Sequence, residues 1–267
     1  MALASSLAIV LYITSGFLLA RRFTKHTQPA AKFSDPIILI ILFALLFHGV
    51  DIFLTMKNTG GWNLSIFSTL IITSWFMAFF AMLIGLRTPI AHPGILIYPI
   101  VAISLFFKTT LPNQYIATSI PPALEWHILL SLTAYSLFTL AAIQAIVLAI
   151  QEQHLHQHHP AGLMRKLPPL QTMENWLFKL IFYGFVVLSL GLFSGFFFLE
   201  DLFSQHLVHK TILSLVSWVV FAILLWGRKT FGWRGKIAVR WTLTGFSFLV
   251  LAYFGSKFVL EFLLDRI

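Results

Sequence analysis

Two histidines in apolar segments are the residues of this chain best suited to chemistry. His48 lies in the run FHGVD, residues 47–51, inside a long apolar stretch, and His127 opens another such stretch. The chain has no cysteine, which excludes thiolate metal sites and iron–sulfur clusters. Histidine is therefore the main candidate ligand for a metal.

The surroundings of His48 favour a metal-ligating role. Helical spacing puts Asp51 three residues on, along the same helix face. A carboxylate there can accept the second N–H of the imidazole, as is usual around metal-bound histidine. Ionisable residues in apolar spans are costly and generally functional. The alternative is a neutral histidine that bonds to a neighbouring helix.

His127 begins a polar stripe. Ser131 and Tyr135 follow it at four-residue steps, and Trp126 precedes it. This spacing places His127, Ser131 and Tyr135 on one helix face, where lipid would reject them and a cofactor pocket would accept them. Serine and tyrosine also form ordinary helix–helix bonds. The stripe is thus a candidate cofactor-binding face, with both interpretations open.

Composition identifies the elements that must position these residues. The chain has 267 residues, of which 58% are hydrophobic and 10% charged, and its mean hydropathy is +0.88. Soluble domains carry about 25% charged residues, so this chain must face lipid. We expect an all-α, polytopic membrane bundle of about eight spans, roughly at 3–20, 36–56, 64–86, 90–109, 123–151, 176–199, 211–227 and 237–263. In a membrane protein, a net charge of +9 is explained by basic residues in the cytoplasmic connections, so it does not indicate a nucleic-acid partner.

Basic residues alternate between the connections. The odd-numbered connections hold eleven and the even-numbered ones three, namely Lys57, Lys108 and Lys210. By the positive-inside rule, the odd connections are cytoplasmic and both termini lie on the outer, periplasmic side. We expect residues 1–267 to form a single transmembrane domain, in which residues 152–175 are a histidine-rich cytoplasmic linker.

This topology brings the two histidines to a similar depth. The span at 36–56 runs outward from the cytoplasmic side, which places His48 in the outer half of the membrane. The span at 123–151 runs inward from the outer face, and His127 lies near its start. Two imidazoles from two helices at one level are the simplest way to hold a haem iron from both sides. We therefore expect His48 and His127 to be axial ligands of a non-covalently bound, b-type haem.

The remaining histidines support weaker hypotheses. The linker tract could collect zinc, nickel or copper, although it lacks acidic or thiol partners and a flexible polar linker explains it as well; it comprises His154, His156, His158 and His159. His206 and His209, in an outer connection, could guard a vestibule. A metal transporter is disfavoured because Asp51 is the only mid-span acid and no inverted repeat is evident.

Two further stretches carry a family resemblance. One is the run GWRGK, residues 232–236, followed by Trp241, Gly245 and the run LAYFG at residues 251–255. The other is the run WHILLSLTAYS, residues 126–136, with Asn63-Leu64-Ser65 as a weaker similarity. Together they resemble the cytochrome c assembly family of CcsA, ResC and CcmC type, in particular its short, HemX-like branch.

The resemblance implies a bacterial inner-membrane protein that binds haem and presents it at the outer face, with a further membrane or periplasmic protein as a possible partner. His127 matches the family's outer-edge histidine, and His48 matches an intramembrane one. The family's tryptophan-rich motif is replaced by LVHK at residues 207–210. Two further family histidines, near residues 226–228 and 264, are missing. We therefore expect haem handling without enzymatic activity, or alternatively a scaffold or regulator that binds no haem.

Overall fold

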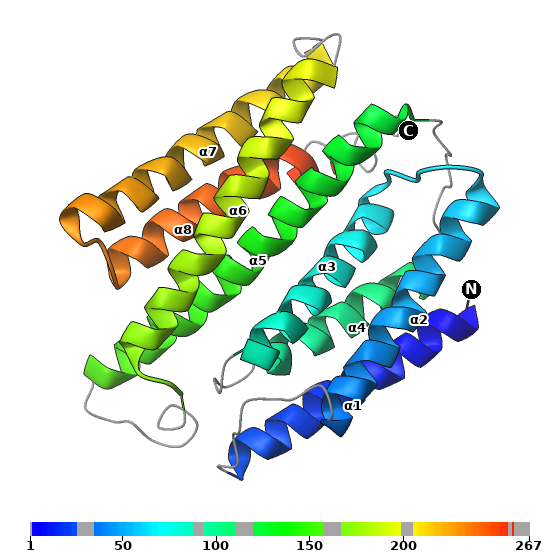
Figure 1. Ribbon diagram of the computed structural model, residues 1–267, viewed down its shortest axis with the longest axis horizontal. Helices are drawn as coiled ribbons and strands as arrows, with labels where there is room; N and C mark the ends of the chain where they lie inside the picture. The colour runs from blue at the N-terminus through cyan, green and yellow to red at the C-terminus, as the bar shows by residue number, and fades with distance from the viewer. Residues whose placement is uncertain are drawn as a thin grey trace. The chain divides into compact units, whose positions relative to one another are not determined.

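The described part of the chain contains eight α-helices and, after the eighth, a π-helical turn, η2 (Leu251–Gly255) (Figure 1). The computed structural model describes residues 2–25, 35–87, 93–110, 120–156, 167–198, 205–255 and 258. The helices are α1 (Ala2–Thr24), α2 (Pro36–Thr59), α3 (Ile66–Arg87), α4 (Gly94–Thr110), α5 (Pro122–His156), α6 (Leu170–Phe198), α7 (Gln205–Phe231) and α8 (Lys236–Val250). Seven of the helical segments are long and apolar enough to cross a membrane. The expectation of a polytopic all-α membrane protein is confirmed.

The helices group into two compact units. Unit 1 contains α1 to α4, and unit 2 contains α5 to α8 with η2. Within unit 1, α1 packs against α2 and α4, and α3 packs against the same two helices. Within unit 2, α5 and α7 each pack against α6 and α8. Each unit is therefore a four-helix arrangement in which every helix has two main neighbours.

Local sequence signals set the ends of α2. Asp35 is its N-cap and accepts a hydrogen bond from the Ile37 backbone N–H at 3.0 Å, and Pro36 occupies the first turn. Gly60 ends the helix with a φ of 75°, which glycine adopts without steric cost. The Asp35 carboxylate also forms an ion pair with Arg22 near the end of α1. This pair joins the end of one helix to the start of the next.

The fourth span is shorter than the sequence predicted. It begins at Gly94 and has 17 residues, about 25 Å of helix against a hydrocarbon core of about 30 Å. Pro99 lies inside it and packs against Gly16 of α1, where an added Cβ would be 3.1 Å from the proline ring. Lys108, which the topology count assigned to a connection, lies within this helix. Residues 88–92 lie outside the described residues.

The predicted linker is partly helical. Helix α5 continues to His156 and α6 begins at Leu170, so both ends of the 152–175 segment belong to helices. Residues 157–166, which include His158 and His159, lie outside the described part of the chain. The helical ends add roughly one turn or more to each of the two adjacent spans.

A stacked aromatic pair forms the centre of unit 2. The rings of Phe138 on α5 and Phe221 on α7 are fully buried, with centroids 3.9 Å apart. Gly184 of α6 packs against Phe138, and Gly245 of α8 packs against Phe221. The Ser217 hydroxyl donates to the Gly245 carbonyl at 2.8 Å. Small residues thus let α6 and α8 approach the two rings closely.

This packing predicts that Gly245→Ala destabilises the protein. The new Cβ would lie 2.8 Å from the Phe221 ring, which cannot retreat because it stacks on Phe138. Overpacking of this kind costs about 1–3 kcal/mol. Thermal unfolding in detergent should show a lower Tm. Gly49→Ala is the matched control, because its Cβ would meet its nearest neighbour at 3.5 Å, and an equal fall in both variants would contradict the packing argument.

Candidate functional site

His48 lies in the interior of unit 1. Its side chain is fully buried on α2. Nδ1 is 3.3 Å from the hydroxyl of Tyr12 on α1, and the two rings meet edge to face. Tyr12 in turn stacks on Tyr98 of α4 at a centroid distance of 5.8 Å. Helices α1, α2 and α4 together therefore fix the orientation of the imidazole.

The second ring nitrogen of His48 lacks a hydrogen bond of normal geometry, although the backbone of Ile71 on α3 interacts with the ring. Nε2 is buried and has no hydrogen-bond partner. An unpaired buried polar atom costs about 1–3 kcal/mol, and such exceptions in a folded protein call for an explanation. Nε2 is consequently an atom that a ligand could satisfy.

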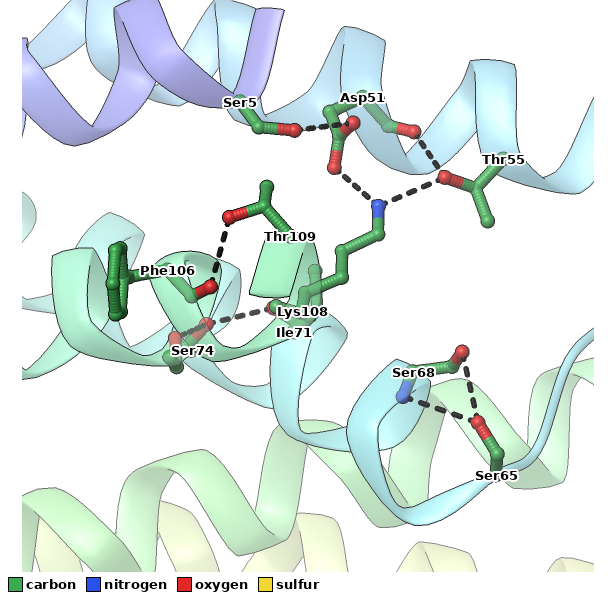
Figure 2. A network of polar contacts seen from close by, with 11 residues as sticks. Ser5, Asp51, Thr55, Ser65, Ser68, Ile71, Ser74, Phe106, Lys108 and Thr109 are labelled. Carbon is green, nitrogen blue, oxygen red and sulfur yellow. Dashed lines mark hydrogen bonds and ion pairs between the residues drawn. The ribbon is translucent and has the colours of Figure 1, made fainter. Parts of the chain in front are cut away.

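Asp51 does not bond to His48, contrary to the sequence expectation. It is fully buried, and its carboxylate accepts hydrogen bonds from Ser5 Oγ at 2.8 Å and from the Lys108 ammonium at 2.5 Å (Figure 2). A cation neutralises the carboxylate, which a neutral imidazole cannot do. Asp51 is therefore half of an ion pair and not the hydrogen-bond partner of the histidine.

Lys108 is the residue that sequence reasoning missed. Its side chain is 10% exposed, and its Nζ also donates to Thr55 Oγ1 at 2.9 Å (Figure 2). No spacing rule links residues 51 and 108. One signal was available, however: a mid-span carboxylate requires an internal partner, and Lys108 directly follows an apolar run.

His127 is half-buried at the start of α5 and bonds to α6. Its Nδ1 is 3.0 Å from the Gly191 carbonyl oxygen and 3.0 Å from Ser194 Oγ. Ser194 itself donates to the same carbonyl at 2.7 Å. A carbonyl can only accept, so the network assigns the proton to Nδ1. Nε2 then carries a lone pair, which is the arrangement found in metal-bound histidines.

The rest of the predicted stripe contacts two helices of unit 2. Ser131 faces α6, where a Cβ added at Gly191 would lie 3.7 Å from its hydroxyl oxygen. Tyr135 is buried and donates to the Leu249 carbonyl of α8 at 2.7 Å. Its ring also meets Tyr253 and Phe254 of η2 edge to face. Tyr135 thus makes a helix–helix bond, one of the two roles left open by the sequence.

The structure describes the other predicted residues only in part. Trp126 is 68% exposed and His209 is exposed. His154 Nδ1 is 2.9 Å from the carbonyl of Ile150, one turn earlier. Among the described residues, no group of three or more histidine, aspartate or glutamate side chains could hold a metal ion. The side chains of His156, His158, His159 and His206 lie outside that part of the chain.

Each candidate ligand is placed within its own unit. His48 belongs to unit 1 and His127 to unit 2. Their sharing of one iron stays a prediction. The geometry shows the surroundings of each ring: His48 is enclosed in unit 1 beside Tyr12, and the contacts of His127 with the Gly191 carbonyl and Ser194 favour a proton on its Nδ1.

Comparison with known proteins gives consistent matches. The profile of a family described as Cytochrome C assembly protein matches residues 33–264. The inner membrane protein YpjD of Escherichia coli strain K12 is 36% identical over 165 residues, covering 61% of this chain and 62% of YpjD. The cytochrome c biogenesis protein CcsA of Guillardia theta is 24% identical over 219 residues, or 73% of each chain. The match thus spans somewhat less than two thirds of the length of YpjD.

The buried ion pair generates a stability prediction. Removal of one charge leaves the other buried and unpaired, which costs about 3–5 kcal/mol, whereas removal of both is far less damaging. Asp51→Asn and Lys108→Met should each lower the Tm strongly in detergent, and the double variant should regain part of the loss. Lys57→Met is the control, since Lys57 is exposed on α2. Strictly additive losses would contradict a direct pair.

Proposed function

The chain belongs to the cytochrome c assembly protein family, and from this membership we propose that it binds haem non-covalently within the membrane. The proposed ligands are His127 and His48. The name of the YpjD relative favours the bacterial inner membrane as its location. The proposed role is to hold or pass on haem for a membrane or periplasmic partner.

The observation that carries the proposal is the tautomer of His127. Its Nδ1–H donates to the Gly191 carbonyl, which leaves Nε2 as the basic nitrogen. The same bond limits rotation of the ring and raises its basicity. The iron of a bound haem would supply the Lewis acid for which this nitrogen is suited.

His48 contributes differently. A ligand role for its Nε2 requires that Nδ1 carry the proton and donate it to the Tyr12 hydroxyl, a bond that also orients the ring. Because the side chain is fully buried, a macrocycle reaches Nε2 only after the helices around it separate. We therefore propose that His127 takes haem first and that His48 binds it in an opened form of unit 1.

The kind of activity we propose rests on the sequence expectation for residues 207–210. There the sequence reads LVHK, and we propose that it takes the place of the tryptophan-rich segment that the family resemblance implies for haem presentation. We propose haem handling without covalent attachment of haem to an apocytochrome. The alternative is a scaffold that binds no haem, which the enclosed His48 and the Tyr135 helix–helix bond favour.

Haem content tests the proposal directly. The full-length protein, expressed with ample haem and purified in detergent, should show a Soret band. His127→Ala should remove most of the bound haem, because it deletes the accessible ligand. His48→Ala should lower haem content less or shift the band. His154→Ala should have no effect, because its ring is held by a carbonyl of its own helix.

Two results would contradict the proposal. A wild-type protein without a Soret band would favour the scaffold. Haem content that is equal in the wild type and in His127→Ala would remove His127 from the site. Circular dichroism of each variant checks that the helices are retained.

A further inference from the structure

A cavity with a volume of about 500 Å³ lies at one end of unit 2. Residues from the end of α5, the start of α6 and the turn between α7 and α8 line it (Figure 1). His127 lies at the opposite end of α5, so the cavity is separate from the proposed haem ligand. Its volume is within the range of small-molecule sites, about 300–1,000 Å³.

Charged side chains of both signs line this cavity. The carboxylates are Glu152 of α5 and Glu174 of α6, and the cations are Arg234 of the turn and Lys236 at the start of α8. In the described part of the chain, none of these four side chains forms an ion pair with another. A ligand that carries a positive and a negative group would therefore find a partner for each.

The two carboxylates meet beside Gly235. Glu174 is 8% exposed, and its Oε1 accepts a hydrogen bond from the Gly235 backbone N–H at 2.7 Å. Oε1 of Glu152 would lie 3.2 Å from a Cβ added at the same glycine. The second oxygen of Glu174 and the carboxylate of Glu152 are left for a ligand. A primary ammonium, which has three N–H donors, suits two carboxylates at one wall.

The turn that carries the cations is held in place by its own contacts. The Arg228 guanidinium donates to the Trp233 carbonyl at 3.1 Å, and the Trp233 N–H donates to the Gly227 carbonyl at 3.3 Å. Arg234 and Lys236 follow directly and flank Gly235, which Glu174 bonds. The two cations are thus presented from a fixed backbone, and a guanidinium and an ammonium are the side-chain groups that bind phosphate.

The cavity lies at the level of the membrane surface. Helix α8 is long and apolar enough to cross a membrane from Lys236 onward, so Lys236 marks the end of the span. Four aromatic rings form a continuous series at this end, with centroid distances of 5.4, 6.2 and 5.4 Å between Trp226, Phe231, Trp233 and Trp241. Tryptophan gathers at membrane–water interfaces. The ligands present at this depth are lipid headgroups.

We propose that this cavity binds the headgroup of a phospholipid with a primary ammonium and a phosphate, as in phosphatidylethanolamine. Glu152 and Glu174 bind the ammonium, and Arg234 and Lys236 bind the phosphate. Ile237, which lines the cavity and is 45% exposed, directs the acyl chains to the bilayer. This site does not depend on the proposed haem function.

Titration with three lipids tests the proposal. The full-length protein in detergent is titrated with phosphatidylethanolamine, with phosphatidylglycerol, which has no ammonium, and with phosphatidylcholine, whose quaternary ammonium has no N–H. Native mass spectrometry measures the bound lipid. The variants are Glu152→Gln and Arg234→Gln. Glu125→Gln and Lys229→Gln are the matched controls, because they make the same kinds of exchange at residues of unit 2 outside the cavity.

The wild type should bind phosphatidylethanolamine about tenfold more tightly than the other two lipids, the contribution of one charged hydrogen bond. Glu152→Gln should abolish this preference without weakening phosphatidylglycerol. Arg234→Gln should weaken both lipids, because both carry the phosphate. The two controls should behave as the wild type.

Equal affinity of the wild type for the three lipids would overturn the proposal, whatever the variants do. A wild-type preference that persists in both Glu152→Gln and Arg234→Gln would also overturn it. Soluble phosphoethanolamine distinguishes the source of the headgroup. It should not displace the lipid at equal concentration, and displacement would assign the cavity to a soluble aminoalkyl phosphate instead of a lipid.

Discussion

The hydrogen bond from His127 Nδ1 to the Gly191 carbonyl, 3.0 Å long, determines what this histidine can do. In hydrocarbon each polar group needs a partner within the protein, and a carbonyl accepts only. The bond therefore satisfies one ring nitrogen and leaves the other basic. It depends on the close contact of α5 with α6, where Gly191 places no side chain between the helices. The proposed binding of haem iron by His127 thus depends on how closely α5 and α6 pack at Gly191.

In unit 1, too, buried polar groups need partners within the protein, and here the partner is a charged side chain. Its most costly group, the Asp51 carboxylate, is neutralised by Lys108 and bonded by Ser5, so α1, α2 and α4 are joined through one charge. Three buried side-chain atoms among the described residues of this unit have no hydrogen-bond partner, namely Nε2 of His48, Nδ2 of Asn63 and the hydroxyl of Tyr98. Of these, only Nε2 of His48 belongs to a proposed metal ligand.

The sequence predicts the general architecture well and the polar contacts poorly. Apolar runs of about 20 residues identify the helices, because a span must satisfy its own backbone. They also located His48 and His127 in helices. The partner of Asp51 was predicted wrongly, since local spacing favours His48 whereas the actual partner is 57 residues away on α4. Tyr135 was left ambiguous for the same reason, because its acceptor is Leu249, 114 residues on. Long-range pairs of this kind depend on helix packing and not on periodicity.

The most direct measurement of the central claim is chemical rescue of the ligand. His127→Gly is loaded with haem in detergent, and its visible and electron paramagnetic resonance spectra are recorded with and without added imidazole. The account predicts that the variant loses the low-spin signal of the wild type and that free imidazole restores it by occupying the vacated position. A variant that keeps the wild-type spectrum without imidazole would show that His127 does not bind the iron.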